Sequence, residues 1–459
     1  MNRASVTKQK LASVLVAIGL VLLAACGDEA FEPSATQFGA ASVGMHHYYV
    51  ATTGSDRNPG TAPLPFRTIQ HALNVATRPG DTILVRAGTY AEAVSFRADG
   101  TAARPIVLEN YPGERPSITG AGARGQELVR IFDRSHVRLL GFDVGNLAAT
   151  SPLDSGAIMI EGYGDDIAIE HNDVHDVVPK AHHYANGRAI NVRGFFAGRP
   201  ITNVTVARNV IERCIVQDGN VLEISGNAAN VTVAANRLLD NGGIAINVTG
   251  GTQPPRYRRW KLQVRNVIVR DNVVERTRGS GAIGLYVQAS DGVLVERNTV
   301  TSNAWGIIVD SEYPEVHARN VTLTSNVVRG NLEAGVMLGS PFFPTTVLGL
   351  IATRNTVTNN GAGEAGSGGN FGIGHAIGVL VRGNTLVAAD RSALLSFGLP
   401  FKDVQLASNC YDAAGHNAAR AYFGYGATTY VGFAAYRSAT HQDAGSSFGA
   451  ACDSPKQKV

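Results

Sequence analysis

Apolar and polar residues follow one another along most of this chain in a phrase that recurs many times. β-Branched residues stand at alternate positions, an asparagine follows at a bend, and a second short apolar stretch comes after it. The segments 204–211 (VTVARNVI) and 293–300 (VLVERNTV) are two examples. Alternating β-branched residues predict a strand, and the polar bend predicts a turn into a second strand.

The asparagine of this phrase returns after 25 to 37 residues. A repeat of that length is typical of solenoids, in which each unit buries its apolar face on the next unit. We therefore predict an all-β solenoid whose exposed positions follow a regular register. The nine positions are Asn172, Asn209, Asn236, Asn272, Asn298, Asn326, Asn355, Asn384 and Asn409.

The first residues are typical of an export signal. Arg3, Lys8 and Lys10 precede an apolar run from Leu11 to Ala25, and Cys26 follows that run. The segment resembles a bacterial lipoprotein signal, which would be removed as residues 1–25 and would leave a lipid on Cys26. The alternative is an uncleaved helical anchor. We expect residues 26–46 to be a flexible tether and the protein to be lipid-anchored to the bacterial cell envelope, at the outer membrane or cell surface.

Charge and cysteine content narrow the picture further. The formal net charge of +3 falls to zero without Arg3, Lys8 and Lys10, which leaves 37 basic against 37 acidic residues. Balanced charge and the lack of a nucleic-acid motif argue against nucleic acid as a partner. Export permits a disulfide, which we assign to Cys410 and Cys452.

The segment that follows the tether carries a family resemblance. It reads YYVATTGSDRNPGT at 48–61 and PFRTIQHAL at 65–73, with apolar residues at helical spacing. It resembles the opening of right-handed parallel β-helix proteins of the pectate-lyase-like superfamily. The resemblance implies a single-stranded right-handed β-helix over residues 47–409, capped by an N-terminal helix, with an irregular closing segment over 410–459.

The resemblance also implies three strands per coil, with the repeated asparagine in the tight turn between the second and third strands. The first strands would then be the glycine-flanked segments after each phrase, which in this family form the substrate groove. We place them at Ala157–Glu161, Ala189–Arg193, Leu222–Ser225, Ala245–Thr249, Gly284–Gln288, Ile307–Asp310 and Val336–Gly339.

Alternation along these strands predicts which side chains point outward. We expect two outward columns, with charged and amide groups concentrated in the first four coils. An ordinary solvated sheet face is the alternative reading. The columns are Met159, Asn191, Glu223, Asn247, Tyr286, Ile308 and Met337, and beside them Glu161, Arg193, Ser225, Thr249, Gln288, Asp310 and Gly339. The candidate substrate-binding residues on them are Glu161, Asn191, Glu223, Asn247 and Tyr286.

Long insertions near this face add candidates, because a regular solenoid does not need them. The loop at 252–261 combines arginines with aromatic rings, and we assign Arg256, Arg259 and Trp260 to substrate binding. Basic and aromatic density suits an anionic ligand with a planar face. A solvated loop is the alternative.

One coil gathers the groups that β-elimination of a uronate needs. Arg188 or Arg193 would pair with the substrate carboxylate. Lys180 would be the base if desolvation lowers its pKa, with His182 or His183 as alternative base or acid. Lyases on this fold often use calcium. The outward columns lack an Asp cluster, so we assign no metal site and leave Ca²⁺ without support.

Two other functions remain open. A hydrolase would use Glu161 and Glu223, which lie two coils apart, about 9–10 Å along the axis. That separation is too long for a retaining pair and marginal for an inverting pair. A structural ion pair between Glu161 and Arg193 is the simpler expectation. The protein would otherwise be a non-catalytic glycan-binding or structural lipoprotein. The favoured reading is a monomer that binds and cleaves an anionic polysaccharide, with membrane contact only through its lipid.

Overall fold

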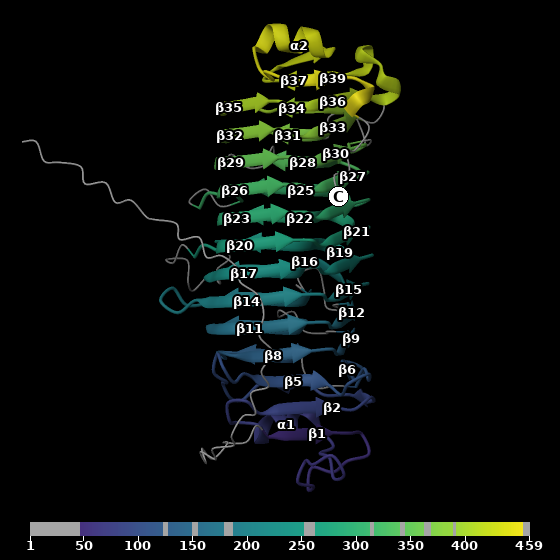
Figure 1. Ribbon diagram of the computed structural model, residues 1–459, viewed down its shortest axis with the longest axis vertical. Helices are drawn as coiled ribbons and strands as arrows, with labels where there is room; N and C mark the ends of the chain where they lie inside the picture. The colour runs from purple at the N-terminus through teal and green to yellow at the C-terminus, as the bar shows by residue number, and fades with distance from the viewer. Residues whose placement is uncertain are drawn as a thin grey trace, which may run out of the picture. The chain divides into compact units, whose positions relative to one another are not determined.

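The protein is described here as a computed structural model. It describes residues 46–122, 127–148, 155–178, 187–251, 262–312, 316–339, 345–361, 369–388 and 392–452. Short strands stack coil upon coil from β1 and α1 to α2 (Figure 1). Three parallel sheets of 13 strands each run along this stack. The predicted right-handed parallel β-helix is confirmed. No helix of the described residues is long and apolar enough to cross a bilayer.

The first sheet, called the β10 sheet here, holds the strands for which we expected a substrate face. Consecutive members pair in parallel, and the hairpin β37–β38 closes the sheet. Its strands are β4 (Val94–Ser95), β7 (Glu127–Phe132), β10 (Ser155–Gly162), β13 (Gly187–Gly194), β16 (Ile215–Gly226), β19 (Gly242–Thr249), β22 (Arg278–Gln288), β25 (Trp305–Asp310), β28 (Ala334–Leu338), β31 (Gly369–Ile373), β34 (Ala393–Phe397), β37 (Tyr422–Tyr425) and β38 (Thr428–Val431).

The second sheet, the β11 sheet, contains the β-branched strand of each repeated phrase. Its strands are β1 (His47–Val50), β2 (Thr82–Val85), β5 (Ile106–Asn110), β8 (Val137–Leu140), β11 (Gly164–Glu170), β14 (Ile201–Ala207), β17 (Ala228–Ala234), β20 (Arg265–Arg270), β23 (Asp291–Glu296), β26 (Arg319–Thr324), β29 (Val347–Thr353), β32 (Ala376–Arg382) and β35 (Phe401–Ala407).

The third sheet, the β12 sheet, is made of the shorter strands that follow the asparagine turns. Its strands are β3 (Thr89–Tyr90), β6 (Ser117–Thr119), β9 (Asp143–Leu147), β12 (Asp173–Val177), β15 (Val210–Glu212), β18 (Arg237–Leu239), β21 (Val273–Glu275), β24 (Thr299–Thr301), β27 (Val327–Arg329), β30 (Thr356–Thr358), β33 (Thr385–Ala388), β36 (Cys410–Ala413) and β39 (Ser447–Phe448).

The repeated asparagines form a continuous buried ladder, as predicted. Asn236 shows the pattern: its side chain donates to the Val206 carbonyl at 2.9 Å and to Asn272 Oδ1 at 3.0 Å. Its own Oδ1 accepts from the backbone and side-chain nitrogens of Asn209, both at 3.0 Å. The ladder therefore satisfies polar groups that each tight turn would otherwise bury without partners.

A second ladder, which the sequence analysis missed, follows the first at an offset of five residues. Asn303 donates to Asn331, which donates in turn to Asn360. Cys214 and Thr277 occupy the same position in their coils, where their backbone N–H groups donate to the next asparagine. The free thiol of Cys214 is buried, and that burial raises its pKa to about 12, so it is chemically quiet.

Both ends of the stack are covered. The helix α1 (Ile69–Val75) buries Ile69, Ala72 and Leu73 against the first coil. At the other end lie the turns η2 (Ala414–His416) and η3 (Ala418–Arg420), the helix α2 (Phe433–Thr440) and the turn η4 (Ala450–Cys452). A disulfide joins Cys410 to Cys452, the pair that the sequence analysis assigned. The stack runs slightly past residue 409, because β36 and β39 still extend the β12 sheet.

A histidine between the coils makes stability depend on pH. His175 on β12 contacts Asp143 at 3.2 Å and Asp176 at 2.7 Å, and these carboxylates raise its pKa to about 9. Because the folded pKa lies above the ordinary 6.5, the stabilisation is complete below pH 6.5 and is lost as pH rises through 9. We expect a loss of about 2–3 kcal/mol in the free energy of unfolding. Urea unfolding at pH 6 and pH 9.5 measures it. A His175→Gln chain that kept the same difference would contradict this assignment.

Candidate functional site

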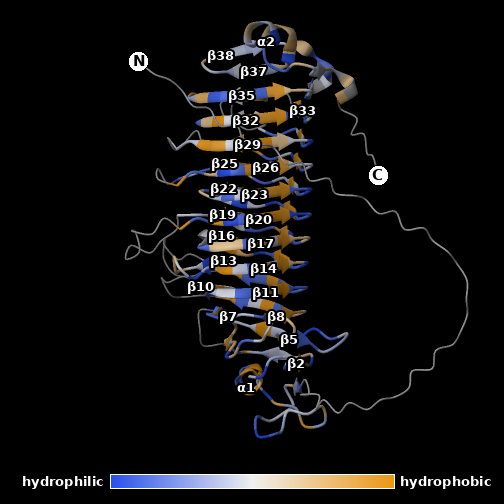
Figure 2. Ribbon diagram, turned by 60° about the vertical axis from the view of Figure 1, so that its left-hand side comes forward, coloured by the Kyte–Doolittle hydropathy of each residue, from blue (hydrophilic) through white to orange (hydrophobic). Residues whose placement is uncertain are grey.

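The outer face of the β10 sheet carries the side chains that the sequence analysis placed there. Met159 pairs with Asn191, Asn191 with Glu223, and Glu223 with Asn247, so the first predicted column is continuous. The second column is continuous as well, from Glu161 through Arg193, Ser225, Thr249 and Gln288 to Asp310. The inward residues between them are buried in the core. Figure 2 shows the strands of this face stacked in order.

The expectation that these columns face solvent is wrong for most of their members. Asn191 and Ser225 have no exposed surface, Glu223 retains 1 %, and Asn247 and Asp310 retain 2 % each. One reason for this burial is that neighbouring polar side chains of this face donate hydrogen bonds to one another. The face is therefore a buried polar layer outside the core.

A third row of side chains, which strand alternation did not predict, contributes to this packing. Arg188 and Asn220 have the parity of inward residues, yet both bond Glu223, which points outward. The ladder between β16 and β19 is irregular just before Asn220. A glycine precedes each of the two residues, and a Cβ at Gly219 would lie 2.1 Å from the Gly187 carbonyl oxygen. These glycines were the available sequence signal for the bend.

The buried ion pair of this face joins Arg188 to Glu223. The Nε–Oε2 distance is 2.7 Å, and Asn220 donates to the same oxygen at 2.8 Å. Burial by itself raises the pKa of Glu223, but the charge of Arg188 and the Asn220 bond outweigh it and lower the pKa to about 2. In the part of the chain that the structure describes, Glu161 and Arg193 do not form the ion pair that we expected. Glu161 instead accepts from Asn191 at 3.3 Å.

Several buried amide oxygens on this face have no hydrogen-bond partner among the described residues. They are Asn191 Oδ1, Asn247 Oδ1 and Gln288 Oε1, and all three residues are at most 5 % exposed. The amide nitrogen of Asn247, by contrast, donates to Asn220 at 3.0 Å. An acceptor left without a partner costs roughly 1–3 kcal/mol, so these enclosed atoms are suited to ordered water within the layer.

The later coils of the same face are different in character. Ile283, Tyr286, Ile308, Ala334 and Met337 form an apolar cluster outside the main core, with Ile244 and Trp305 packed against it. The Tyr286 hydroxyl donates to Asp310 at 2.6 Å. Burial, followed by the charge of Asp310, raises the pKa of Tyr286 well above its usual value, so the hydroxyl stays protonated. The first column of this face is therefore polar from β13 to β19 and apolar from β22 onward apart from the Tyr286 hydroxyl, while the second column keeps Gln288 and Asp310.

Arg193 lies at the edge of the polar layer and is only half-buried. Its guanidinium carbon is 5.3 Å from the centre of the Phe195 ring. Its neighbours across the ladder are Glu161 and Ser225. Of the two arginines considered for binding a substrate carboxylate, Arg193 is the more accessible, because Arg188 is 6 % exposed and committed to Glu223.

Several predicted site residues lie outside the described residues. They are Lys180, His182, His183, Arg256, Arg259, Trp260 and Cys26. Among the described residues, no group of three His, Cys, Asp or Glu side chains is arranged to hold a metal ion. The described part of this face therefore does not offer the carboxylate cluster that a calcium-dependent lyase would use.

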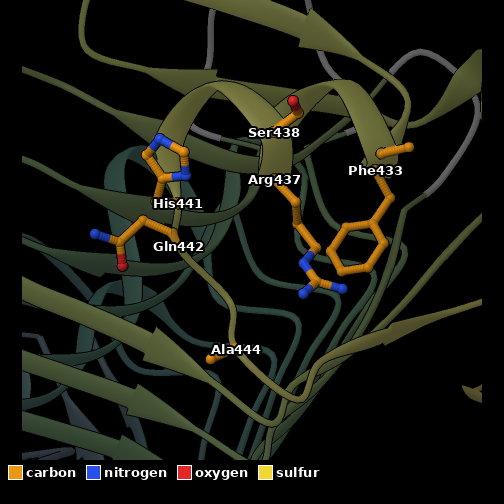
Figure 3. Close-up of a pocket in the computed structure, with 7 residues that line it drawn as sticks. Phe433, Arg437, Ser438, His441, Gln442 and Ala444 are labelled. Atoms are coloured by element: carbon orange, nitrogen blue, oxygen red, sulfur yellow. The ribbon is translucent and has the colours of Figure 1, made fainter.

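A pocket elsewhere on the molecule does not coincide with this face. It lies against α2, between Phe433, Arg437, His441, Gln442 and Ala444 (Figure 3). Gln442 bonds the backbone of Val404 and Leu406, so it ties the closing segment to the last coil. The pocket shares no residue with the polar layer.

Comparisons with known families agree with the fold. A model described as the Pel9A-like right-handed β-helix region matches residues 48–231, and one described as a right-handed β-helix region matches residues 256–386. A lacto-N-biosidase structure from Eubacterium ramulus aligns with a TM-score of 0.53 at 16% identity, over 80% of this chain and 64% of that one. At that identity the likeness concerns the fold alone.

Two curated proteins are similar in sequence. The Bacillus subtilis (strain 168) protein YwoF, described as uncharacterized, is 29% identical over 305 residues, which are 64% of each chain. Pectate lyase PEL9 of Emericella nidulans is 42% identical over 74 residues, which are 16% of this chain and 18% of that protein. The chain thus spans less than two thirds of each of these relatives.

Proposed function

Since the chain belongs to the right-handed parallel β-helix proteins of the pectate-lyase-like superfamily, we propose that it binds a uronate-containing polysaccharide and cleaves it by β-elimination. The site would be the outer face of the β10 sheet, over the coils from β10 to β19. The proposal includes catalytic roles for Arg193 and Lys180. These roles are assigned from what β-elimination of a uronate requires.

The observation that carries the proposal is a half-buried arginine at the edge of a buried polar layer. Arg193 has intermediate exposure, whereas Asn191, Glu223 and Asn247 are buried. The guanidinium of Arg193 suits the carboxylate of a uronate. The layer also holds amide oxygens without partners among the described residues, and such buried groups are costly in a face that has only a structural role.

The chemistry assigned to these residues balances without an external reagent. Arg193 would neutralise the uronate carboxylate, which makes the neighbouring C5 proton more acidic. A neutral Lys180 amine, or His182 or His183 in its place, would take that proton. The electron pair of the broken C5–H bond forms the C4=C5 double bond, the C4–O bond breaks, and the leaving oxygen takes up a proton. Glu223 stays ionised with a pKa of about 2, so it would hold Arg188 in place and not act as an acid.

Sequence similarity supports the class of reaction and not its details. The relative with a named activity is a pectate lyase, and the likeness extends over 74 residues. It favours an acidic, pectin-like chain as the first substrate to test. The sugar and the linkage are matters for the assay.

A glycan panel tests this function. The form lacking residues 1–26 is incubated with pectate, alginate, glycosaminoglycans and neutral glycans, and both reducing ends and unsaturated-uronate absorbance are followed. We expect both signals to rise together on one uronan. Reducing ends without the absorbance would mean hydrolysis and would move the chemistry to Glu161 and Glu223. If neither signal rises on any glycan, cleavage is contradicted and only the glycan-binding function remains.

We further propose that the protein acts at the bacterial cell envelope, attached through lipid on Cys26. The support is the sequence alone: a basic start, an apolar run and a cysteine after Ala25. Expression with a labelled fatty acid should mark the native chain and leave a Cys26→Ser chain unmarked. Equal labelling of the two would contradict the assignment.

A further inference from the structure

An arginine–aromatic site lies next to the polar layer, in the turns that lead from the β10 sheet to the β11 sheet. It consists of Tyr163, Phe195, Phe196 and Arg199, and we call it the platform. The Arg199 guanidinium carbon lies 3.3 Å from the centre of the Tyr163 ring. Tyr163 and Phe196 have ring centres 6.3 Å apart, tilted by 58°.

The platform is held in place by the fold. The turn at 195–200 closes on itself, with the Arg199 N–H donating to the Phe196 carbonyl at 3.3 Å. The buried Asn227 donates to the carbonyls of Phe196 and Ala197 at 2.7 Å and 3.0 Å. A surface turn fixed by a buried side chain of the next coil presents its rings and its cation in one arrangement, which lowers the entropy lost on binding a ligand.

The chemistry of the platform suits an anion attached to an apolar face. Among the residues that the structure describes, no carboxylate lies within ion-pair distance of the exposed Arg199. Stacking on Tyr163 uses the face of the guanidinium and leaves its N–H edges available for a carboxylate. Two acids close to this turn already have hydrogen-bond donors. Asp133 accepts from the Tyr163 N–H at 3.2 Å, and Asp165 accepts from Thr202 and Asn203 at 2.7 Å and 2.6 Å.

The position of the platform relates it to the polar layer. Arg193, whose guanidinium lies over Phe195, is the last outward residue of β13 before the platform turn. A chain bound along the polar layer and lying on Arg193 would therefore have the platform turn at its side.

We propose that the platform is a subsite for a uronate residue beyond the one being cleaved. The carboxylate would bind the N–H edges of Arg199, and the C–H face of the sugar would lie on Phe196. This inference rests on the proposed function for the class of ligand, an acidic glycan. It adds a second carboxylate contact that contributes to affinity and to the preference for acidic chains, and takes no part in the chemical step.

Direct binding tests the platform independently of cleavage. The full-length chain is titrated with hexamers of galacturonate, mannuronate and glucuronate, and with the methyl ester of each. We compare the native protein, Arg199→Ala, Arg199→Lys and the control Arg329→Ala, whose exposed side chain lies on β27 of another sheet. For the acid hexamer that binds, we expect Arg199→Ala to weaken affinity about tenfold and Arg199→Lys to weaken it less. Arg199→Ala should bind the methyl-ester hexamer about as well as the native protein does. The control Arg329→Ala should bind the acid hexamer with native affinity.

The outcomes separate the two proposals. Unchanged affinity of Arg199→Ala for the acid hexamer overturns the platform, even if the protein cleaves uronan. If Arg199→Ala loses affinity tenfold and the native protein cleaves no uronan, the platform is supported and the lyase chemistry is contradicted. If none of the acid hexamers binds the native protein, the platform is not an acidic-glycan subsite and the inference fails.

Discussion

Replacing Arg193 by alanine should lower the rate of uronan cleavage by about 100- to 1000-fold. The reason is that elimination develops negative charge on the substrate carboxylate, and loss of a charge-stabilising donor in a desolvated site has an effect of that size. Arg193 is the half-buried arginine of the polar layer, whereas Arg188 is already paired with Glu223. The quantity to measure is kcat/KM for the uronan identified by the glycan panel.

Two comparisons make this result specific to carboxylate binding. Arg193→Lys keeps the charge but loses the fork of donors, so it should retain more activity than Arg193→Ala. Arg329→Ala, on the exposed surface of β27, should match the native protein. If an Arg193→Ala chain folds normally and keeps full activity, Arg193 does not bind the substrate carboxylate, and the proposed role of Arg193 is contradicted.

Replacing Asn236 by alanine should lower the free energy of unfolding by about 3–5 kcal/mol. The change removes both side-chain bonds that Asn236 donates, to the Val206 carbonyl and to Asn272. It also orphans the two donors of Asn209 that bond its oxygen. Each buried polar group left without a partner costs roughly 1–3 kcal/mol, and several arise at once.

The neighbouring residue supplies a matched control. Arg237 follows Asn236 directly, and its side chain is exposed on β18. Arg237→Ala should change stability by less than about 0.5 kcal/mol. Denaturant unfolding of the three chains measures the difference. If Asn236→Ala were as stable as Arg237→Ala, the ladder would be an incidental row of asparagines and not a source of stability.

The sequence predicted the coil and its register because both depend on local patterns. Period-two alternation placed Ile158, Ile190 and Leu222 inward, and these residues are buried in the core. The repeated asparagine marked one turn of each coil. The second ladder followed at a constant offset of five residues, at Asn303, Asn331 and Asn360, and the offset was a readable signal that the analysis did not use.

The burial and contacts of the side chains in the site were harder to predict from the sequence. Alternation gives the face of a sheet but not what packs on it, so the burial of Asn191 and Glu223 was not foreseen. Parity placed Arg188 among inward residues, whereas a local bend turns it toward Glu223. The two arginines of one coil thus have different environments. Arg188 is buried and holds the carboxylate of Glu223, and Arg193 lies at the edge of the layer.

The most direct test of this account is a crystal structure of the Lys180→Ala chain, lacking residues 1–26, with a uronate hexamer bound. Removal of the assigned base should leave the hexamer uncleaved. We predict that the sugar lies over the coils from β10 to β19, with one carboxylate on Arg193. A hexamer bound on the β11 sheet or in the pocket against α2, with the polar layer empty, would contradict it.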